Sequence, residues 1–180
     1  SITLLIQKIG TKWSQYPYIS WENNIMKNIS VIGVGRLGLC FALTLEEAGY
    51  DVVGVDISYD YVNSLNNKTF SSSEYGLTDK LNESVNFSAT TSIEKAIEHS
   101  DVLFVVVATP SLPDGRYDHR QIDNIIEELE SLGRCETEKE FVVCCTTMPG
   151  YCDSIKTRLK KINYTVSYNP EFIAQGTILR

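Results

Sequence analysis

Short apolar runs recur along the chain from residue 28 onward, and polar, amphipathic segments separate them. Runs that are apolar almost throughout are typical of strands buried on both faces of a parallel sheet. They predict strands over residues 29–33, 52–56, 102–108, 141–146 and 164–168.

The intervening segments place apolar residues at the three- and four-residue spacing of an α-helix. They predict helices over residues 37–48, 59–66, 92–99, 119–132 and 152–161. Gly49 directly follows the first helix and is suited to a left-handed C-cap, while Ser92 is a plausible N-cap. Residues 67–83 are polar and predict a loop.

Strands that alternate with amphipathic helices predict an α/β fold, namely a Rossmann-type doubly wound parallel sheet of about six strands with helices on both faces. Residues 27–180 carry this pattern. Residues 1–26 show no clear period and precede the first strand directly, so we expect them to form an N-terminal arm or a segment upstream of the domain.

Composition narrows the possible functions. A net charge of −7 argues against nucleic-acid binding, which usually needs a basic face. No apolar run approaches the ~20 residues of a membrane-spanning helix, and we expect a cytoplasmic protein without a membrane partner. The five cysteines lack the CxxC spacing of a zinc or redox site, so we expect small buried hydrophobic residues and no metal.

A glycine-rich turn links the first predicted strand to the first predicted helix. Gly33 permits a tight turn, Gly35 lets the backbone approach a pyrophosphate, and Gly38 allows close packing of helix on strand. Asp56 ends the next strand, where its carboxylate can accept hydrogen bonds from the ribose hydroxyls and would repel a 2′-phosphate. This spacing predicts a dinucleotide site that favours NAD over NADP, although Gly-rich turns also occur as purely structural features.

Two further residues lie inside this turn, Arg36 and Leu37, and we expect both at the cofactor. Arg36 could pair with a phosphate or with a surface carboxylate, and the sequence leaves both open.

Polar side chains also follow the later strands, whose carboxyl ends face the ligand in a doubly wound sheet. Thr109 and Pro110 follow one strand, Thr147 the next, and Glu171 the last. A glutamate at such an end can act as a general base on water. Taken singly, the Thr109-Pro110 loop is more often structural, and a glutamate at a strand end is more often a surface group or a helix cap, so position alone does not assign a role.

Taken together, these segments resemble the N-terminal domain of the UDP-glucose/GDP-mannose dehydrogenase family over residues 27–180. The matching stretches are IGVGRLG at 32–38, VGVD at 53–56, EYGL at 74–77, Thr109-Pro110 with Asp114-Gly115 and Asp118, TTMP at 146–149, and NPEF at 169–172 with Gly176. Many dehydrogenases share the first motif, whereas the NPEF segment and the loop after Thr109 are more specific.

The resemblance implies oxidation of a UDP- or GDP-sugar alcohol to the uronic acid with two NAD, through a thiohemiacetal and a thioester on a family cysteine. It implies that Glu171 assists thioester hydrolysis and that Thr147 positions water or substrate near the nicotinamide. It also implies that Phe172, Ile173 and Gln175 contact the nucleotide sugar. Thr109, Pro110 and Thr147 would line the cofactor path.

The chain departs from the family pattern in places. Tyr61 stands where many members have a basic residue, and Gln175 replaces an acidic or otherwise polar one. Tyr151 and Cys152 replace the usual Gly-Thr, so Cys152 is not the family nucleophile. That cysteine and the dimer helix belong to family segments that follow residue 180, which implies a homodimeric full-length protein and an inactive fragment.

Two other readings stay open. One is a non-catalytic NAD-sensing regulatory domain, which gives no reason for the NPEF segment. The other is a different NAD-dependent hydroxyacid dehydrogenase, which would need a catalytic Lys or His. His99 and His119 lie at the ends of predicted surface helices, so we expect both to be solvated and poorly placed for that role.

Overall fold

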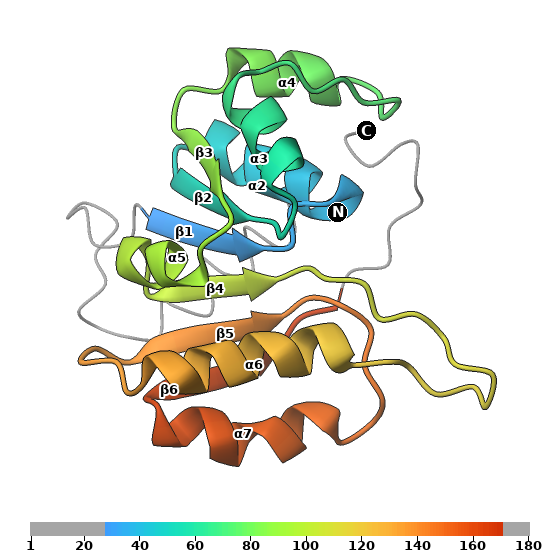
Figure 1. The fold of residues 1–180 in the computed structure, drawn as a ribbon, viewed down its shortest axis with the longest axis vertical. Coiled ribbons are helices and arrows are strands. Elements are labelled where there is room, and N and C mark those ends of the chain that lie inside the picture. Colours follow the sequence, from blue (N-terminus) through green and yellow to red (C-terminus); the bar gives the residue numbers. More distant parts are fainter. Residues whose placement is uncertain (1–27, 171–180) are drawn as a thin grey trace.

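The computed structural model describes residues 28–170, which form a six-stranded, fully parallel sheet in the order β3-β2-β1-β4-β5-β6 (Figure 1). The predicted Rossmann-type doubly wound fold is confirmed. The strands are β1 (Asn28–Ile32), β2 (Asp51–Val55), β3 (Phe87–Thr90), β4 (Val102–Val105), β5 (Lys139–Val143) and β6 (Tyr164–Tyr168).

Six helices connect these strands within residues 28–170. They are α2 (Arg36–Glu47), α3 (Tyr59–Asn66), α4 (Leu77–Glu83), α5 (Ile93–His99), α6 (Arg120–Leu132) and α7 (Tyr151–Lys161). The predicted caps are confirmed, because Gly49 has a φ of 97° and the Ser92 hydroxyl accepts a hydrogen bond from the Lys95 amide. None of the helices in this part of the chain is long and apolar enough to cross a membrane.

Three features differ from the sequence-based expectation. The predicted loop over 67–83 contains α4, which buries Leu77 and Leu81 against α2 and was hidden by its polar composition. The short strand β3 was not singled out, since only its Ala89 is fully buried. β4 ends at Val105 rather than at residue 108, because the register with its neighbour β1 stops at the pair of Ile32 and Val105, beyond which the Val106 amide makes one further bond to the Ile32 carbonyl.

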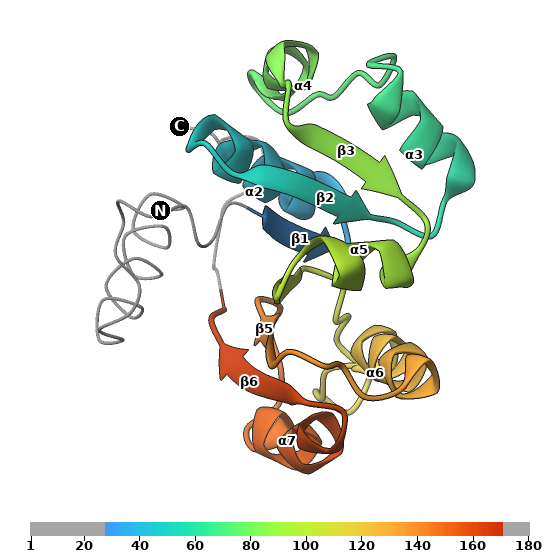
Figure 2. The same ribbon diagram turned by 90° about the vertical axis from the view of Figure 1, so that its left-hand side faces the viewer.

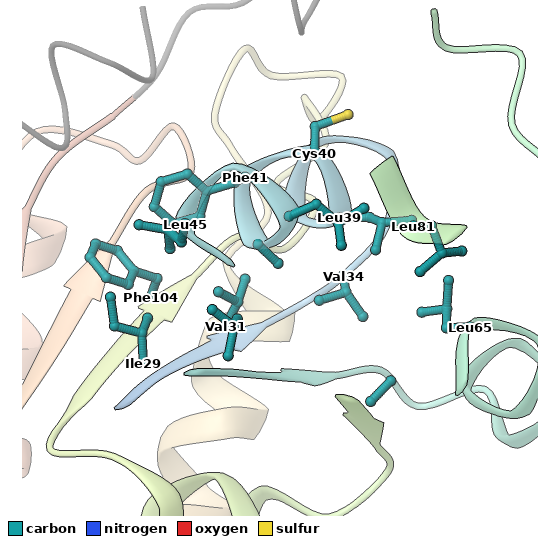
Figure 3. Packing of buried hydrophobic residues seen from close by; sticks show 14 of the residues in the cluster. Ile29, Val31, Val34, Leu39, Cys40, Phe41, Leu45, Leu65, Leu81 and Phe104 are labelled. Carbon is teal, nitrogen blue, oxygen red and sulfur yellow. The ribbon is translucent and has the colours of Figure 1, made fainter. Parts of the chain in front are cut away.

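Each face of the sheet has its own apolar core. On one face, α2 packs on β1 and β4, and the rings of Phe41 and Phe104 meet edge to face at 5.0 Å (Figure 3). On the other face, α5, α6 and α7 cover the sheet and bury residues such as Leu103, Ile126 and Phe141 (Figure 2). The two-sided burial explains why the strands are apolar almost throughout.

The strand order reverses between β1 and β4, and this point determines where a ligand would lie. Ile32 lies in register with Val55 on one side and with Val105 on the other, and the Val106 amide donates to the Ile32 carbonyl at 2.8 Å. The loops that follow β1 and β4 therefore diverge from adjacent strand ends. In open α/β sheets the ligand crevice forms at this topological switch point.

Candidate functional site

The glycine-rich turn after β1 is compressed against its neighbours. The Gly33 amide donates to the Val55 carbonyl at 2.8 Å, and Gly33 has a φ of 94°. A Cβ on Gly33 would lie 2.5 Å from the Val106 carbonyl oxygen, and one on Gly38 would lie 1.8 Å from the Gly33 carbonyl oxygen. Any side chain at either position would therefore collide with backbone, which accounts for both glycines.

Gly35 faces open space instead. It is the N-cap of α2, makes no side-chain capping bond, and a Cβ built on it would meet nothing within 4 Å. The first turn of α2 carries no acidic residue, so the positive end of the helix is not offset by a carboxylate. Exposed backbone amides at a helix N-terminus fit the pyrophosphate of a dinucleotide. Arg36 is exposed and Leu37 half-buried at this end.

Asp56 lies beside this turn at the carboxyl end of β2. Its amide donates to the Thr90 carbonyl at 3.1 Å, and its Oδ1 accepts from the Ser58 amide at 3.0 Å. Because Gly33 bonds to Val55, the residue before Asp56, the carboxylate and the glycine turn are held at one edge of the sheet. This arrangement fits the ribose contact that the sequence predicted for Asp56.

Tyr61 has a role that the sequence did not indicate. Its hydroxyl donates to the Val34 carbonyl inside the glycine turn at 2.8 Å, and its ring packs edge to face on Phe70 at 5.1 Å. Burial, with a further contribution from Asp56, raises the pKa of Tyr61 to about 12, so the hydroxyl stays a hydrogen-bond donor. Tyr61 therefore fixes the turn from α3.

The segment after β4 forms a small excursion before α6. Pro110 is exposed and Thr109 half-buried, and the Pro110 carbonyl accepts from the Asp118 amide at 2.9 Å. Within the excursion, the Arg116 side chain donates a hydrogen bond of 2.8 Å to the Asp114 carboxylate. This bond holds the pKa of the Asp114 carboxyl below its usual range. The excursion thus returns to the sheet beside Pro110.

Thr147, in the loop after β5, is anchored through its backbone and its hydroxyl. The Thr147 amide donates to the Tyr168 hydroxyl at 3.4 Å, and its Oγ1 lies 3.9 Å from the Cys152 Sγ. The next amide, that of Met148, donates to His119 Nε2 at 3.2 Å. Tyr168 comes from β6, His119 from the N-terminus of α6 and Cys152 from α7, so three elements meet at this loop.

The two histidines are not solvated as expected. The His99 side chain is 16% exposed, with Nε2 3.0 Å from the Asp51 carbonyl oxygen, and it joins α5 to β2. His119 is half-buried against Tyr151. Both expectations were wrong because partners distant in sequence cover the two rings.

The end of β6 leads into the predicted substrate segment. The Asn169 amide donates to the Val143 carbonyl at 2.9 Å, while its side-chain nitrogen is buried with no hydrogen-bond partner among residues 28–170. Glu171 lies outside them, as do three predicted substrate contacts, Phe172, Ile173 and Gln175.

All five cysteines are free, and no group of three metal-ligating side chains gathers within the described residues. Cys40 and Cys144 are buried as expected, whereas Cys135, Cys145 and Cys152 are half-buried. Burial raises the pKa of Cys145 to about 11 and raises that of Cys152 as well. Neither thiol is therefore activated as a nucleophile.

The structure thus gathers the predicted cofactor residues that it describes at the carboxyl ends of β1, β2, β4 and β5. Sequence reasoning missed the ring-bearing residues that fix these loops. They are Tyr61, His119, Tyr151 and Tyr168. Of these four residues, the sequence singled out Tyr61 alone, because Tyr61 stands where many family members have a basic residue.

Comparisons with known proteins show which family the chain resembles. The NAD binding domain of the UDP-glucose/GDP-mannose dehydrogenase family matches residues 27–180. An uncharacterised protein of Methanocaldococcus jannaschii is 39% identical over 83% of the chain, and GDP-mannose 6-dehydrogenase of Pseudomonas aeruginosa is 31% identical over 84%. The chain spans only 17% and 38% of the lengths of these two relatives.

The fold comparison leads to the same group. A crystal structure of a ternary complex of GDP-mannose dehydrogenase from Pseudomonas aeruginosa superposes with a TM-score of 0.74 at 29% identity, covering 83% of this chain and 37% of that one. The chain therefore belongs to the UDP-glucose/GDP-mannose dehydrogenase family, in which it forms an NAD-binding domain of Rossmann type.

Proposed function

We propose that this chain is the cofactor-binding part of a nucleotide-sugar 6-dehydrogenase, which oxidises a UDP- or GDP-sugar alcohol to the uronic acid with two NAD. The observation that carries the proposal is the open N-terminus of α2 beside Asp56, at the switch point of the sheet. The family match and the ordered strand-end segments support the substrate class. The NAD-sensing and other hydroxyacid dehydrogenase readings lack this second line of support.

The phosphate end of the site is built from backbone. The close contacts at Gly33 and Gly38 bring α2 against the turn, and Gly35 leaves the amides of the first helical turn accessible. These amides, flanked by Arg36 and Leu37, would hold the pyrophosphate. Asp56 would accept hydrogen bonds from the adenosine ribose and repel a 2′-phosphate.

The reacting end would lie where the loops after β4 and β5 leave the sheet. Bound NAD supplies the hydride acceptor there. Thr109 and Pro110 would line the cofactor path, and the Thr147 hydroxyl would position water or substrate. The half-buried setting of Thr147, anchored to Tyr168, suits a positioning role.

The substrate end of the proposal rests on sequence alone. Glu171 would assist thioester hydrolysis, and three neighbours would contact the nucleotide sugar. These neighbours are Phe172, Ile173 and Gln175.

Whole-protein properties belong to the same proposal. The 180-residue polypeptide would bind NAD without turning it over, since no cysteine in it matches the family nucleophile. The full-length protein would be a cytoplasmic homodimer, with residues 1–26 as an arm ahead of the NAD-binding domain.

The test is calorimetric titration of the chain with NAD and with NADP, repeated for Asp56→Ala. Asp60→Ala is the matched control, because Asp60 is an exposed carboxylate in the first turn of α3 only four residues away. We expect NAD to bind, NADP to bind weakly, and Asp56→Ala alone to lower NAD affinity at least about tenfold, as the loss of charge-assisted hydrogen bonds would. Tighter binding of NADP than of NAD would overturn the assignment of Asp56.

A second arm tests the reaction. The protein expressed from the full coding sequence, supplied with NAD and with GDP-mannose or UDP-glucose, should form two NADH for each sugar oxidised. One NADH for each sugar, with an aldehyde product, would refute the four-electron oxidation.

A further inference from the structure

Two successive amides in the loop after β5 donate to side chains rather than to other backbone groups. The Thr147 amide donates to the Tyr168 hydroxyl at 3.4 Å and the Met148 amide to His119 Nε2 at 3.2 Å. The loop has left the sheet at Val143, so these amides have no strand to pair with. The two rings therefore supply the hydrogen bonds that the ladder no longer provides.

The His119 bond fixes the protonation state of the ring. An amide donor requires a lone pair on Nε2, so the imidazole is neutral with its proton on Nδ1. The ring stacks on Tyr151 with centroids 3.8 Å apart and planes 29° from parallel. The Tyr151 hydroxyl donates in turn to Asp123 Oδ1 at 2.8 Å, which links the N-termini of α6 and α7 around the loop.

We propose that neutral His119 is a positioning residue for Thr147, because it holds the Met148 amide and thereby fixes the loop that presents the Thr147 hydroxyl to the nicotinamide end of the site. The proposal rests on the proposed function through the role of Thr147. His119 touches neither substrate nor cofactor in this arrangement, and it acts through the loop. Protonation of Nε2 would replace the acceptor with a donor that faces another donor, so the loop would lose this anchor in acid.

The charges around His119 determine where this change occurs. Burial lowers the pKa of His119 below its ordinary value, whereas Asp123 on α6 and Asp118 before it favour the protonated ring. Arg120 offsets Asp118 through a bond of 2.7 Å, and Tyr151 from α7 donates to Asp123. Since the pKa is lowered on folding, the anchor is complete above about pH 6.5 and is lost as pH falls through the folded-state pKa.

Nuclear magnetic resonance on the chain without NAD tests the anchor directly. Nitrogen shifts of the imidazole should report the Nδ1–H form, and the amide signals of Thr147 and Met148 should titrate together with His119, at a pH below 6.5. A ring in the Nε2–H form, or a Met148 signal that ignores the His119 titration, would overturn the proposal. This readout does not depend on NAD binding, so it stands apart from the Asp56 test.

Variants separate positioning from simple stability. His119→Gln places an amide oxygen near the Nε2 position and should keep the Met148 amide protected, whereas His119→Leu should speed its exchange about 2- to 10-fold. His99→Leu is the matched control, since His99 bonds to β2 at the opposite end of the sheet. Equal exchange at Met148 in His119→Leu and the wild type would refute the anchor.

In the full-length protein, His119→Leu should lower kcat and leave the KM for NAD unchanged, because the pyrophosphate and ribose contacts lie on β1 and β2. His119→Gln should restore kcat and remove the acid limb that His119 adds to the pH profile. A raised KM for NAD with unchanged kcat would overturn the positioning role. If NAD fails to bind while the His119 titration is observed, the proposed function fails and the anchor stands.

Discussion

Replacement of Gly38 by alanine tests the compressed glycine turn. The added Cβ would lie 1.8 Å from the Gly33 carbonyl oxygen, about 1.6 Å short of the 3.4 Å at which ordinary contacts begin. The two atoms nearest to the added Cβ are the backbone carbonyl oxygen and carbon of Gly33, so no side-chain rotation relieves the clash. The helix α2 must therefore move away from β1. Overpacking of this kind costs up to about 3 kcal/mol, and the better helix propensity of alanine returns about 1 kcal/mol.

We therefore expect Gly38→Ala to lower the free energy of unfolding by about 2 kcal/mol, which for a domain of this size lowers Tm by about 4–8 °C. Scanning calorimetry measures this directly. Gly35→Ala is the control, because its Cβ would meet nothing within 4 Å and its φ of −62° suits alanine. It should lower Tm by less than half as much yet weaken NAD binding at least about tenfold, since its methyl group occupies the face that the pyrophosphate approaches.

The two variants thus separate folding from binding. If Gly38→Ala melts with the wild type, α2 does not pack on the turn as closely as described. If Gly35→Ala binds NAD like the wild type, the pyrophosphate does not lie on this face of the turn.

Three further predictions concern contacts away from the glycines. Tyr61→Phe removes the hydrogen bond to the Val34 carbonyl and should lower both the free energy of unfolding, by about 1 kcal/mol in urea titrations, and the affinity for NAD. If neither quantity changes, α3 does not fix the turn. Lys139→Met keeps the buried side-chain stem but removes the ammonium that donates to two backbone carbonyls and to Asp101. It should lower the free energy of unfolding by about 2 kcal/mol at pH 7, and an unchanged value in the same urea titrations would contradict these contacts. Because burial raises the pKa of Cys145 to about 11, alkylation of the native chain by iodoacetamide at pH 8 should leave Cys145 much slower than a free thiol, and fast labelling there, read by mass spectrometry, would contradict the buried setting.

The sequence was informative where a residue's role is local. The apolar runs at β1, β2 and β5 reflect burial on both faces, and their bounds were predicted to within two or three residues. The edge strand β6 was predicted at its observed bounds, although of its residues only Tyr164 is fully buried. Gly33 and Gly38 were assigned for the reasons that the structure gives, because a tight turn and a close helix contact each exclude a side chain.

Prediction failed where the determining contact is distant in sequence. The helix α4 contributes only Leu77 and Leu81 to the core, and its other positions are polar, so the segment resembled a loop. His119 was expected in solvent because nothing near it in sequence shows that Tyr151 covers its ring, or that an amide 29 residues later donates to it.

The missed residues share a physical role. Loops that leave the carboxyl end of a parallel sheet lose the ladder, so their backbone groups need other partners. Tyr61 supplies a donor to the loop after β1, while His119 and Tyr168 supply acceptors to the loop after β5. The glycine and strand-end motifs thus set which groups reach the ligand, whereas rings contributed by α3, α6 and β6 fix where those groups lie. It follows that a substitution at one of these rings should disturb the geometry of the site while every motif residue is retained.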